Sequence, residues 1–265
     1  MCYYRSVKIK NQDLLKINDI ERDLSGYDYE ALVTDGFAYG ATPVIVSKVD
    51  CGWDIVQMEW GFIPHYLASR DAVEKFRRGY TDGQGKFRPP MTTLNAIGED
   101  LLLPGKMYRD AALKRRCLFV STSFYEWRHV FPIGKKGQPL KTAVKYPYNI
   151  RTKGDSEIHF TAGIWQSWTD KETGETIDTC ALVTTKANRL MEQIHNTKKR
   201  MPTILTPELA GEWISDGLSE ERITEIATFQ YPAELMEAWP IHKEFKTASD
   251  PSQFFEYADL PLLTM

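Results

Sequence analysis

The chain has 265 residues, of which 42% are hydrophobic and 26% charged, and its net charge is −3. These values are ordinary for a globular protein and exclude a strongly basic nucleic-acid-binding protein, although they leave room for a local basic patch. There is no apolar run of 18 residues and the start, MCYYRSVKIK, has no export signal, so we expect a cytoplasmic protein without a membrane span and with reduced cysteines.

The first two thirds of the chain are predicted to be rich in strands. Residues 44–60 are predicted to form a β-hairpin, because two β-rich runs flank Asp50-Cys51-Gly52. The segment 70–90, rich in charge, Gly and Pro, is predicted to be a loop, and residues 94–103 and 106–115 are predicted to be helices. Strands follow, separated by turns rich in Gly, Lys and Thr, at 117–121, 124–130, 142–150, 157–165 and 176–184. This succession predicts a curved, mostly antiparallel, barrel-like sheet.

The last third is predicted to form short helices that flank the sheet. Residues 187–194 have helical character, and Thr206, followed by proline and glutamate, is a strong N-cap. Ser219 precedes two glutamates and starts another helix, and the acidic, aromatic tail from Ser249 is expected to pack along the surface. No change in composition marks a domain boundary. We therefore expect an α+β fold with residues 1–265 in a single domain.

Cys51, Cys117 and Cys180 are predicted to be buried, because each lies in or beside an apolar, strand-like run. Together with Cys2 they are widely spaced and form no Cys-x-x-Cys motif. The sequence therefore predicts neither a zinc site nor a disulfide framework, and no metal or cofactor is expected.

Cys2 differs from the other cysteines because of its position. Once Met1 is removed, Cys2 carries an α-amine and a thiol on adjacent carbons, with ordinary pKa values of about 7.7–8 and about 8.5. An aldehyde condenses with such an amine to an imine, and the thiol then closes onto the same carbon to give a thiazolidine. While Met1 is attached, the amine is part of a peptide bond and this ring cannot form.

Short motifs along the chain occur in one order and resemble the SOS response-associated peptidase (SRAP) family. They are Met1-Cys2, Trp60-Gly61-Phe62-Ile63-Pro64, Asn95-Ala96, Arg116-Cys117-Leu118, Phe124-Tyr125-Glu126-Trp127, Ala162-Gly163-Ile164-Trp165, and Ile194-His195 followed by Arg200-Met201-Pro202. The resemblance is strongest over residues 1–205, with residues 206–265 expected to belong to the same unit. It implies a protein that removes its own Met1 and crosslinks Cys2 to abasic sites in single-stranded DNA. Separately, we expect the protein to be a monomer.

The resemblance also implies the catalytic residues. Cys2 matches the family's nucleophile and Asn95 the asparagine that holds the N-terminal amine. Glu126 matches the acidic residue near that amine, and His195 the histidine beside the sugar. These residue types suit the chemistry, because a carboxyl of adjusted pKa can shuttle protons and a histidine that titrates near neutrality can protonate the sugar oxygen.

Basic and aromatic residues are expected to contact the DNA. The resemblance implies phosphate contacts by Arg5, Arg200 and the basic loop around Arg88, with Phe87 or Trp60 as a surface for base stacking. Lys198 and Lys199 are expected to add charge.

The chain departs from the family pattern in three places, which leaves the DNA footprint open. It begins with Cys2-Tyr3-Tyr4-Arg5 where the family usually has Cys-Gly-Arg. It has Asn95-Ala96-Ile97 in place of Asn-Ala-Arg, and its His-x-Arg is stretched to His195-Asn196-Thr197-Lys198-Lys199-Arg200.

Two other interpretations remain open. In the first, the protein is an N-terminal nucleophile amidohydrolase in which Cys2 attacks a small-molecule amide and its own amine acts as base. In the second, it is a DNA-binding module without chemistry. A thiol protease built on Cys117 and His195 is excluded, because Cys117 opens an apolar strand, where a thiol is inert.

Overall fold

The structure is a computed structural model and describes residues 2–10, 14–17, 20–23, 27, 29–48, 52–154 and 156–264. Its centre is a closed ring of strands, in which β13 pairs with both β10 and β14 and thereby joins the two ends of the sheet. Neighbours in the ring are antiparallel, except that β14 and β6 run parallel. The strands of the ring are β5 (Ala41–Ser47), β6 (Trp53–Trp60), β10 (Arg116–Ser121), β13 (His159–Thr169) and β14 (Thr176–Lys186).

Three short strands extend this barrel. β9 (Asn95–Ile97) and β15 (Arg200–Pro202) pair with β14, and β16 (Ile204–Leu205) pairs with β13. The predicted α+β fold with a curved, mostly antiparallel, barrel-like sheet is therefore confirmed. The predicted hairpin within residues 44–60 is also confirmed, since β5 and β6 are antiparallel partners, although its turn at residues 49–51 lies outside the described residues.

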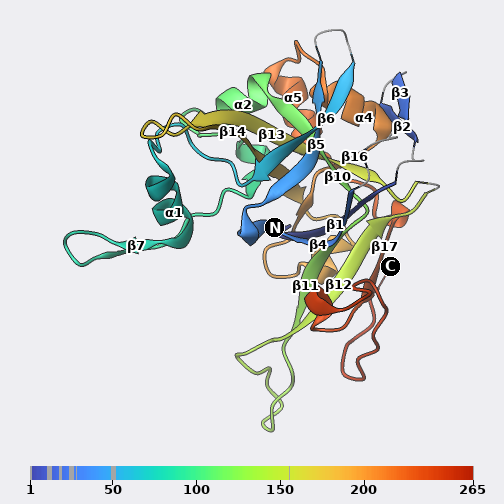
Figure 1. The fold of residues 1–265 in the computed structure, drawn as a ribbon. Coiled ribbons are helices and arrows are strands. Elements are labelled where there is room, and N and C mark those ends of the chain that lie inside the picture. Colours follow the sequence, from blue (N-terminus) through green and yellow to red (C-terminus); the bar gives the residue numbers. More distant parts are fainter. Residues whose placement is uncertain are drawn as a thin grey trace.

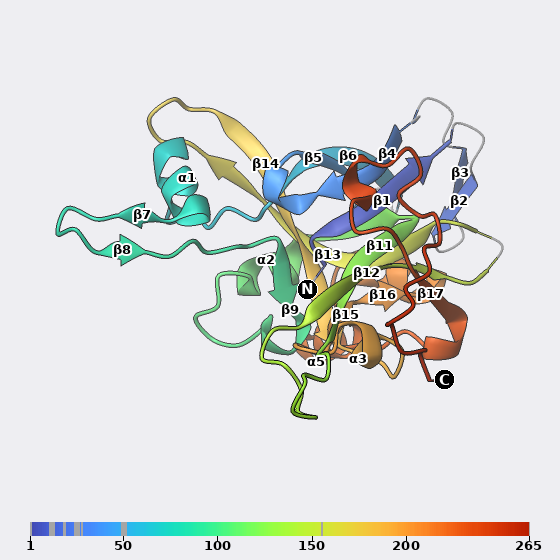
Figure 2. The same ribbon diagram turned by 90° about the horizontal axis from the view of Figure 1, so that it is seen from below.

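A second, antiparallel sheet packs beside the barrel and carries the start of the chain (Figure 1). Its strands, in spatial order, are β17 (Met236–Pro240), β12 (Val144–Thr152), β11 (Ser123–Val130), β1 (Tyr4–Ile9) and β4 (Tyr29–Asp35). Because β1 begins two residues after Cys2 and lies between β4 and β11, the N-terminal segment lies in the middle of the molecule in both views (Figures 1 and 2).

Two-stranded sheets and short helices complete the fold. β2 (Leu14–Ile17) pairs with β3 (Ile20–Asp23), and β7 (Tyr80–Thr81) pairs with β8 (Phe87–Arg88). The α-helices are α1 (Arg70–Arg78), α2 (Arg109–Lys114), α3 (Met191–Ile194), α4 (Pro207–Ile214) and α5 (Glu220–Ala227). The 3₁₀ turns are η1 (Gly36–Ala38), η2 (Gly98–Asp100), η3 (Ala233–Leu235) and η4 (Phe245–Thr247). Within the described ranges, no helix is long and apolar enough to cross a membrane.

The predicted N-caps of α4 and α5 are confirmed. The Thr206 hydroxyl accepts a hydrogen bond from Leu209 N at 3.3 Å, and the Ser219 hydroxyl accepts one from Arg222 N at 3.2 Å. The tail packs on the surface as expected, where the Tyr257 hydroxyl donates to the carbonyl of Ile241 at 2.8 Å.

Two predictions of local structure were wrong. The segment 70–90, expected to be a loop, contains α1 and the β7–β8 hairpin. Its charges stabilise the helix, because Asp71 pairs with Lys75 one turn later at 2.5 Å and Ser69 caps the first turn. The segment 94–103, expected to be a helix, forms β9 and η2, because Asn95–Ile97 pairs with the edge of β14.

The core contains two of the three cysteines that were predicted to be buried. Cys117 and Cys180 have no exposed surface, and burial raises the pKa of both thiols, so they are protonated and inert. Cys51 lies outside the described residues.

Candidate active site

Cys2 lies buried at the entrance to β1, with 1% of its surface exposed. Its thiol donates a hydrogen bond to the carbonyl of Tyr4 at 3.7 Å and packs in the same apolar cluster as Leu94 and Ile194. Burial, together with the negative charge of Glu126, raises the pKa of Cys2 to about 12. The thiol is therefore held in its protonated form.

Glu126 reaches this region from the neighbouring strand. β1 and β11 pair with Tyr4 opposite Tyr125, so the next residue of β11 lies beside the segment that leads from Cys2 into β1. The side chain of Glu126 is buried, and burial raises its pKa to about 7. At neutral pH the carboxyl is present in both protonation states, as a proton shuttle requires.

His195 follows α3 and faces Glu126, with Nε2 lying 4.0 Å from Glu126 Oε2. Its other ring nitrogen, Nδ1, lies 2.9 Å from Arg200 O and 3.2 Å from Arg200 N. Burial lowers the pKa of His195 to about 4, so the ring is neutral at pH 7. This corrects the expectation that His195 titrates near neutrality: within this pair, it is Glu126 that does so.

Asn95 lies on β9, at the edge of the barrel that faces the N-terminal segment. The preceding residue, Leu94, packs in the cluster of Cys2, and its carbonyl accepts a hydrogen bond from Trp60 Nε1 at 2.9 Å. The amide nitrogen and oxygen of Asn95 are both buried and have no partner within the part of the chain that the structure describes. A buried amide without partners is able to orient a polar group that enters the site.

Two residues expected to contact DNA are instead core residues. Arg5 has no exposed surface, and its guanidinium donates to Val120 O at 2.5 Å and to Ser121 Oγ at 2.9 Å. Trp60 is 1% exposed and packs against Phe119 with the ring centroids 5.9 Å apart. The prediction of a phosphate contact by Arg5 and of base stacking on Trp60 was wrong, because both side chains fill the barrel.

Phe87 and Arg88 lie on an arm that projects from the body of the molecule. The β7–β8 hairpin extends away from the barrel in both views (Figures 1 and 2). Phe87 is 61% exposed, and Arg88 forms an ion pair with Asp82 at 2.9 Å. Both side chains are accessible to a ligand.

The basic residues after His195 differ in accessibility. Lys198 and Lys199 are exposed, whereas Arg200 is half-buried and its guanidinium makes two bonds of 2.8 Å to Glu99. Burial is the main cause of the pKa shifts of Glu126 and His195, and the ammonium group of Lys198 lowers the pKa of both groups by a smaller amount. Lys198 therefore lies within electrostatic reach of the candidate site, while the charge of Arg200 is already neutralised.

Two residues at the site were not anticipated from the sequence. Glu99 pairs with Arg200 across the barrel edge, and Asn196 hydrogen-bonds to the backbone of His129 on the strand of Glu126. The sequence offered a signal only for Asn196, which lies inside the stretched His195–Arg200 segment. In the described ranges, no three His, Cys, Asp or Glu residues lie close enough together to hold a metal ion.

Known proteins share sequence similarity with this chain. A model of the family described as SOS response associated peptidase (SRAP) matches residues 8–248. The chain belongs to this family. Its SRAP relatives include YoqW of Bacillus subtilis, named an abasic site processing protein, which is 34% identical over 51% of this chain and 53% of YoqW. YobE of the same organism, with the same description, is 33% identical over 65% of this chain and 77% of YobE. The aligned part thus spans about half of YoqW and more than two thirds of YobE.

Solved structures share the fold of this SRAP chain. A protein from Bacteroides thetaiotaomicron superposes with a TM-score of 0.68 and 30% identity, over 84% of this chain and 85% of that one. A phage-related protein from Bordetella bronchiseptica superposes with a TM-score of 0.60 over 96% of this chain and 100% of that one, and at 21% identity it shows the fold alone.

Proposed function

We propose that this protein processes abasic sites, and that it does so by removing Met1 and crosslinking the mature Cys2 to the sugar aldehyde in single-stranded DNA. The observation that carries the proposal is the buried group of Cys2, Glu126 and His195, in which a carboxyl with a pKa of about 7 lies next to the thiol. Family membership and relatives named abasic site processing proteins support it.

The proposed reaction forms two bonds and releases one water. The free amine of Cys2 attacks the aldehyde carbon, and Glu126 in its protonated form donates a proton as the hydroxyl leaves as water. The resulting imine carbon is then attacked by the sulfur, whose proton passes to the Glu126 carboxylate. One C–N bond and one C–S bond form, giving a thiazolidine, and Glu126 returns to its starting state.

The neighbouring residues have supporting roles in this proposal. Asn95 orients the amine of Cys2 through its unpaired amide, without adding charge. His195 is neutral and hydrogen-bonds to the sugar oxygen. Phe87, Arg88, Lys198 and Lys199 are accessible and contact the strand, whereas Arg200 contributes only if Glu99 releases it.

The decisive experiment compares cysteine variants on uracil-containing single-stranded DNA after the uracil has been excised. Cys2→Ala should form no denaturation-resistant adduct. Cys117→Ala should crosslink as the wild type does, because Cys117 is an internal core residue without a free α-amine. Mass spectrometry of the wild type checks at the same time that Met1 is gone. A Cys2→Ala protein that crosslinks at the wild-type yield would overturn the mechanism.

The same experiment distinguishes the crosslinking function from the amidohydrolase alternative. That alternative also needs the free amine and thiol of Cys2, but it requires no adduct with DNA. A wild-type protein that has lost Met1 and still forms no adduct would favour it.

A further inference from the structure

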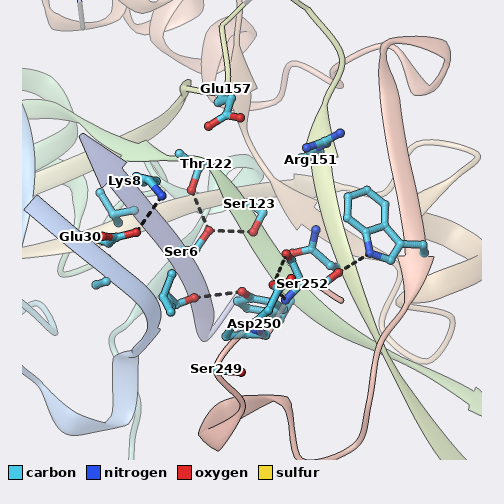
Figure 3. Close-up of a pocket in the computed structure, with 17 residues that line it drawn as sticks. Ser6, Lys8, Glu30, Thr122, Ser123, Arg151, Glu157, Ser249, Asp250 and Ser252 are labelled. Atoms are coloured by element: carbon cyan, nitrogen blue, oxygen red, sulfur yellow. Dashed lines mark hydrogen bonds and ion pairs between the residues drawn. The ribbon is translucent and has the colours of Figure 1, made fainter. Parts of the chain in front are cut away.

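A cavity of about 430 Å³ lies against the five-stranded sheet, and Figure 3 shows residues that line it. It is on the face of the sheet opposite to Glu126. Tyr125 lines this cavity, and because consecutive side chains of a strand point to opposite faces, it lies behind Glu126 on β11. Strands β1, β4, β11, β12 and β17 contribute to the walls, and residues 249–252 close one side. The cavity is therefore separate from the Cys2 site.

Uncharged hydroxyl groups form part of this cavity. The Ser6 hydroxyl lies 2.7 Å from the hydroxyl of Thr122 and 2.8 Å from that of Ser123, as the dashed lines of Figure 3 show. The Tyr125 hydroxyl donates to Leu32 O at 3.0 Å. A hydroxyl both donates and accepts, so this group is able to exchange hydrogen bonds with other hydroxyls.

Asn149 supplies an unused acceptor in the same cavity. It is 1% exposed, and its Oδ1 has no hydrogen-bond partner among the described residues. A buried carbonyl oxygen is satisfied in most proteins, so this one indicates a missing donor. A ligand that presents a hydroxyl or an N–H to Asn149 would satisfy it.

The charged residues at the rim disfavour an anionic ligand. Lys8 is paired with Glu30 at 2.9 Å, and Arg151 is paired with Glu237 and lies over the ring of Trp239 at 5.1 Å. The other charged residues that line the cavity, Glu157 and Asp250, are acidic. A phosphate would meet no unpaired cation here, so this cavity is unsuited to the DNA backbone.

We propose that the cavity binds a neutral, hydroxyl-rich molecule built around one sugar ring, either a free monosaccharide or a nucleoside. One ring hydroxyl would donate to Asn149 Oδ1, and others would exchange hydrogen bonds with the Ser6, Thr122 and Ser123 group. The volume of about 430 Å³ lies within the range of small-molecule sites. This site is independent of the crosslinking function proposed above.

Binding is measured on the full chain by NMR, following the side-chain amide of Asn149 while D-ribose, thymidine, thymidine 5′-monophosphate or spermidine is added at millimolar concentrations. We expect ribose or thymidine to shift the NMR resonances of the Asn149 side-chain amide. Comparing the ribose and thymidine titrations distinguishes a monosaccharide ligand from a nucleoside. Thr122→Val should weaken that binding about 3- to 10-fold by removing one hydrogen bond. Thr169→Val, which removes a hydroxyl bonded to Thr176 at 2.8 Å elsewhere, should leave the binding unchanged.

The proposal is overturned if neither ribose nor thymidine shifts the amide, or if the nucleotide or spermidine binds more tightly than both. It is also overturned if Thr122→Val and Thr169→Val weaken binding equally. Glu126→Gln serves as a further reference, because it should slow crosslinking strongly and leave this binding intact. Loss of one activity without the other thus distinguishes failure of this proposal from failure of the proposed function.

Discussion

The side-chain amide of Asn196 forms two hydrogen bonds with the backbone of His129. His129 N donates to Asn196 Oδ1 at 3.0 Å, and Asn196 Nδ2 donates to His129 O at 2.8 Å. Since His129 is on the strand of Glu126 and Asn196 follows His195, this pair fixes the distance between the two facing side chains.

We predict that Asn196→Ala lowers the crosslinking rate about tenfold and the stability by about 1–3 kcal/mol, because two hydrogen bonds are lost. The pH dependence of crosslinking should shift as well, since the surroundings of Glu126 change. Gln230→Ala is the matched control, because the Gln230 amide also bonds two backbone carbonyls, those of Lys186 and Ala187. If the control loses as much rate and shifts the pH profile equally, Asn196 has no positioning role.

Glu126→Gln is predicted to slow crosslinking by about 10²- to 10⁴-fold, the usual contribution of a general acid–base group. The wild-type rate should show an inflection near pH 7, where burial places the pKa of Glu126, and the variant should lack it. Single-turnover rates between pH 5 and 9 test this. An unchanged inflection in the variant would assign it to another group.

Stability should depend on pH through two opposing groups. The pKa of Glu126 is raised from 4.5 to about 7, so its contribution is present below pH 4.5 and lost as the pH rises through about 7. The pKa of His195 is lowered from 6.5 to about 4, so its contribution is present above pH 6.5 and lost as the pH falls through about 4. Urea denaturation of Glu126→Gln should therefore reveal stability that rises between pH 4 and 6.5 more steeply than in the wild type. An equal or shallower rise would contradict the assigned shifts.

Arg5 is predicted to matter for folding and not for DNA binding. Arg5→Met should destabilise the protein by about 2–5 kcal/mol, because the buried Val120 carbonyl and the Ser121 and Thr42 hydroxyls lose their donor. Lys198→Met should leave stability unchanged but reduce the salt slope of DNA binding by about 0.7. Thermal unfolding measures the effect of each variant on stability, and binding titrations at several salt concentrations measure its effect on DNA binding. A reduced salt slope in Arg5→Met would show that Arg5 contacts a phosphate after all.

Ile97 offers a test of the DNA footprint, since it is 41% exposed and stands where the family pattern has arginine. Ile97→Arg should steepen the salt dependence of crosslinking by about 0.7 for one new single-strand contact, whereas the uncharged Ile97→Met should not. Both proteins should crosslink faster to single-stranded than to duplex abasic DNA, because extruding a nucleotide from a duplex costs a few kcal/mol. Equal rates on both substrates without salt dependence would argue against a DNA-binding groove.

Local sequence signals correctly predicted those elements whose formation depends on neighbouring residues in the chain. The Thr206 and Ser219 caps act within one helical turn, and the strands around Cys117 and Cys180 carry continuous apolar runs. The β-strand at Asn95 could not be read this way, because its partner, Leu182, lies far along the chain.

The candidate site, too, depends on residues that are distant in the sequence and could not be predicted from local signals alone. The four residues Cys2, Asn95, Glu126 and His195 were selected by resemblance, but their protonation depends on burial, which no motif encodes. Arg5 was assigned to DNA by the resemblance, whereas its side chain is buried and its acceptors Thr42, Val120 and Ser121 are supplied by distant strands.

The burial of Cys2 has a consequence for how the protein is stored and handled. Oxidants and alkylating reagents attack the thiolate, and a thiol that is 1% exposed with a pKa of about 12 presents almost none of it. Iodoacetamide should therefore leave Cys2, Cys117 and Cys180 unmodified in the folded protein and modify all three after denaturation. A nucleophile kept in this state survives peroxide and glutathione disulfide, so the reactive group would be preserved until an aldehyde reaches it.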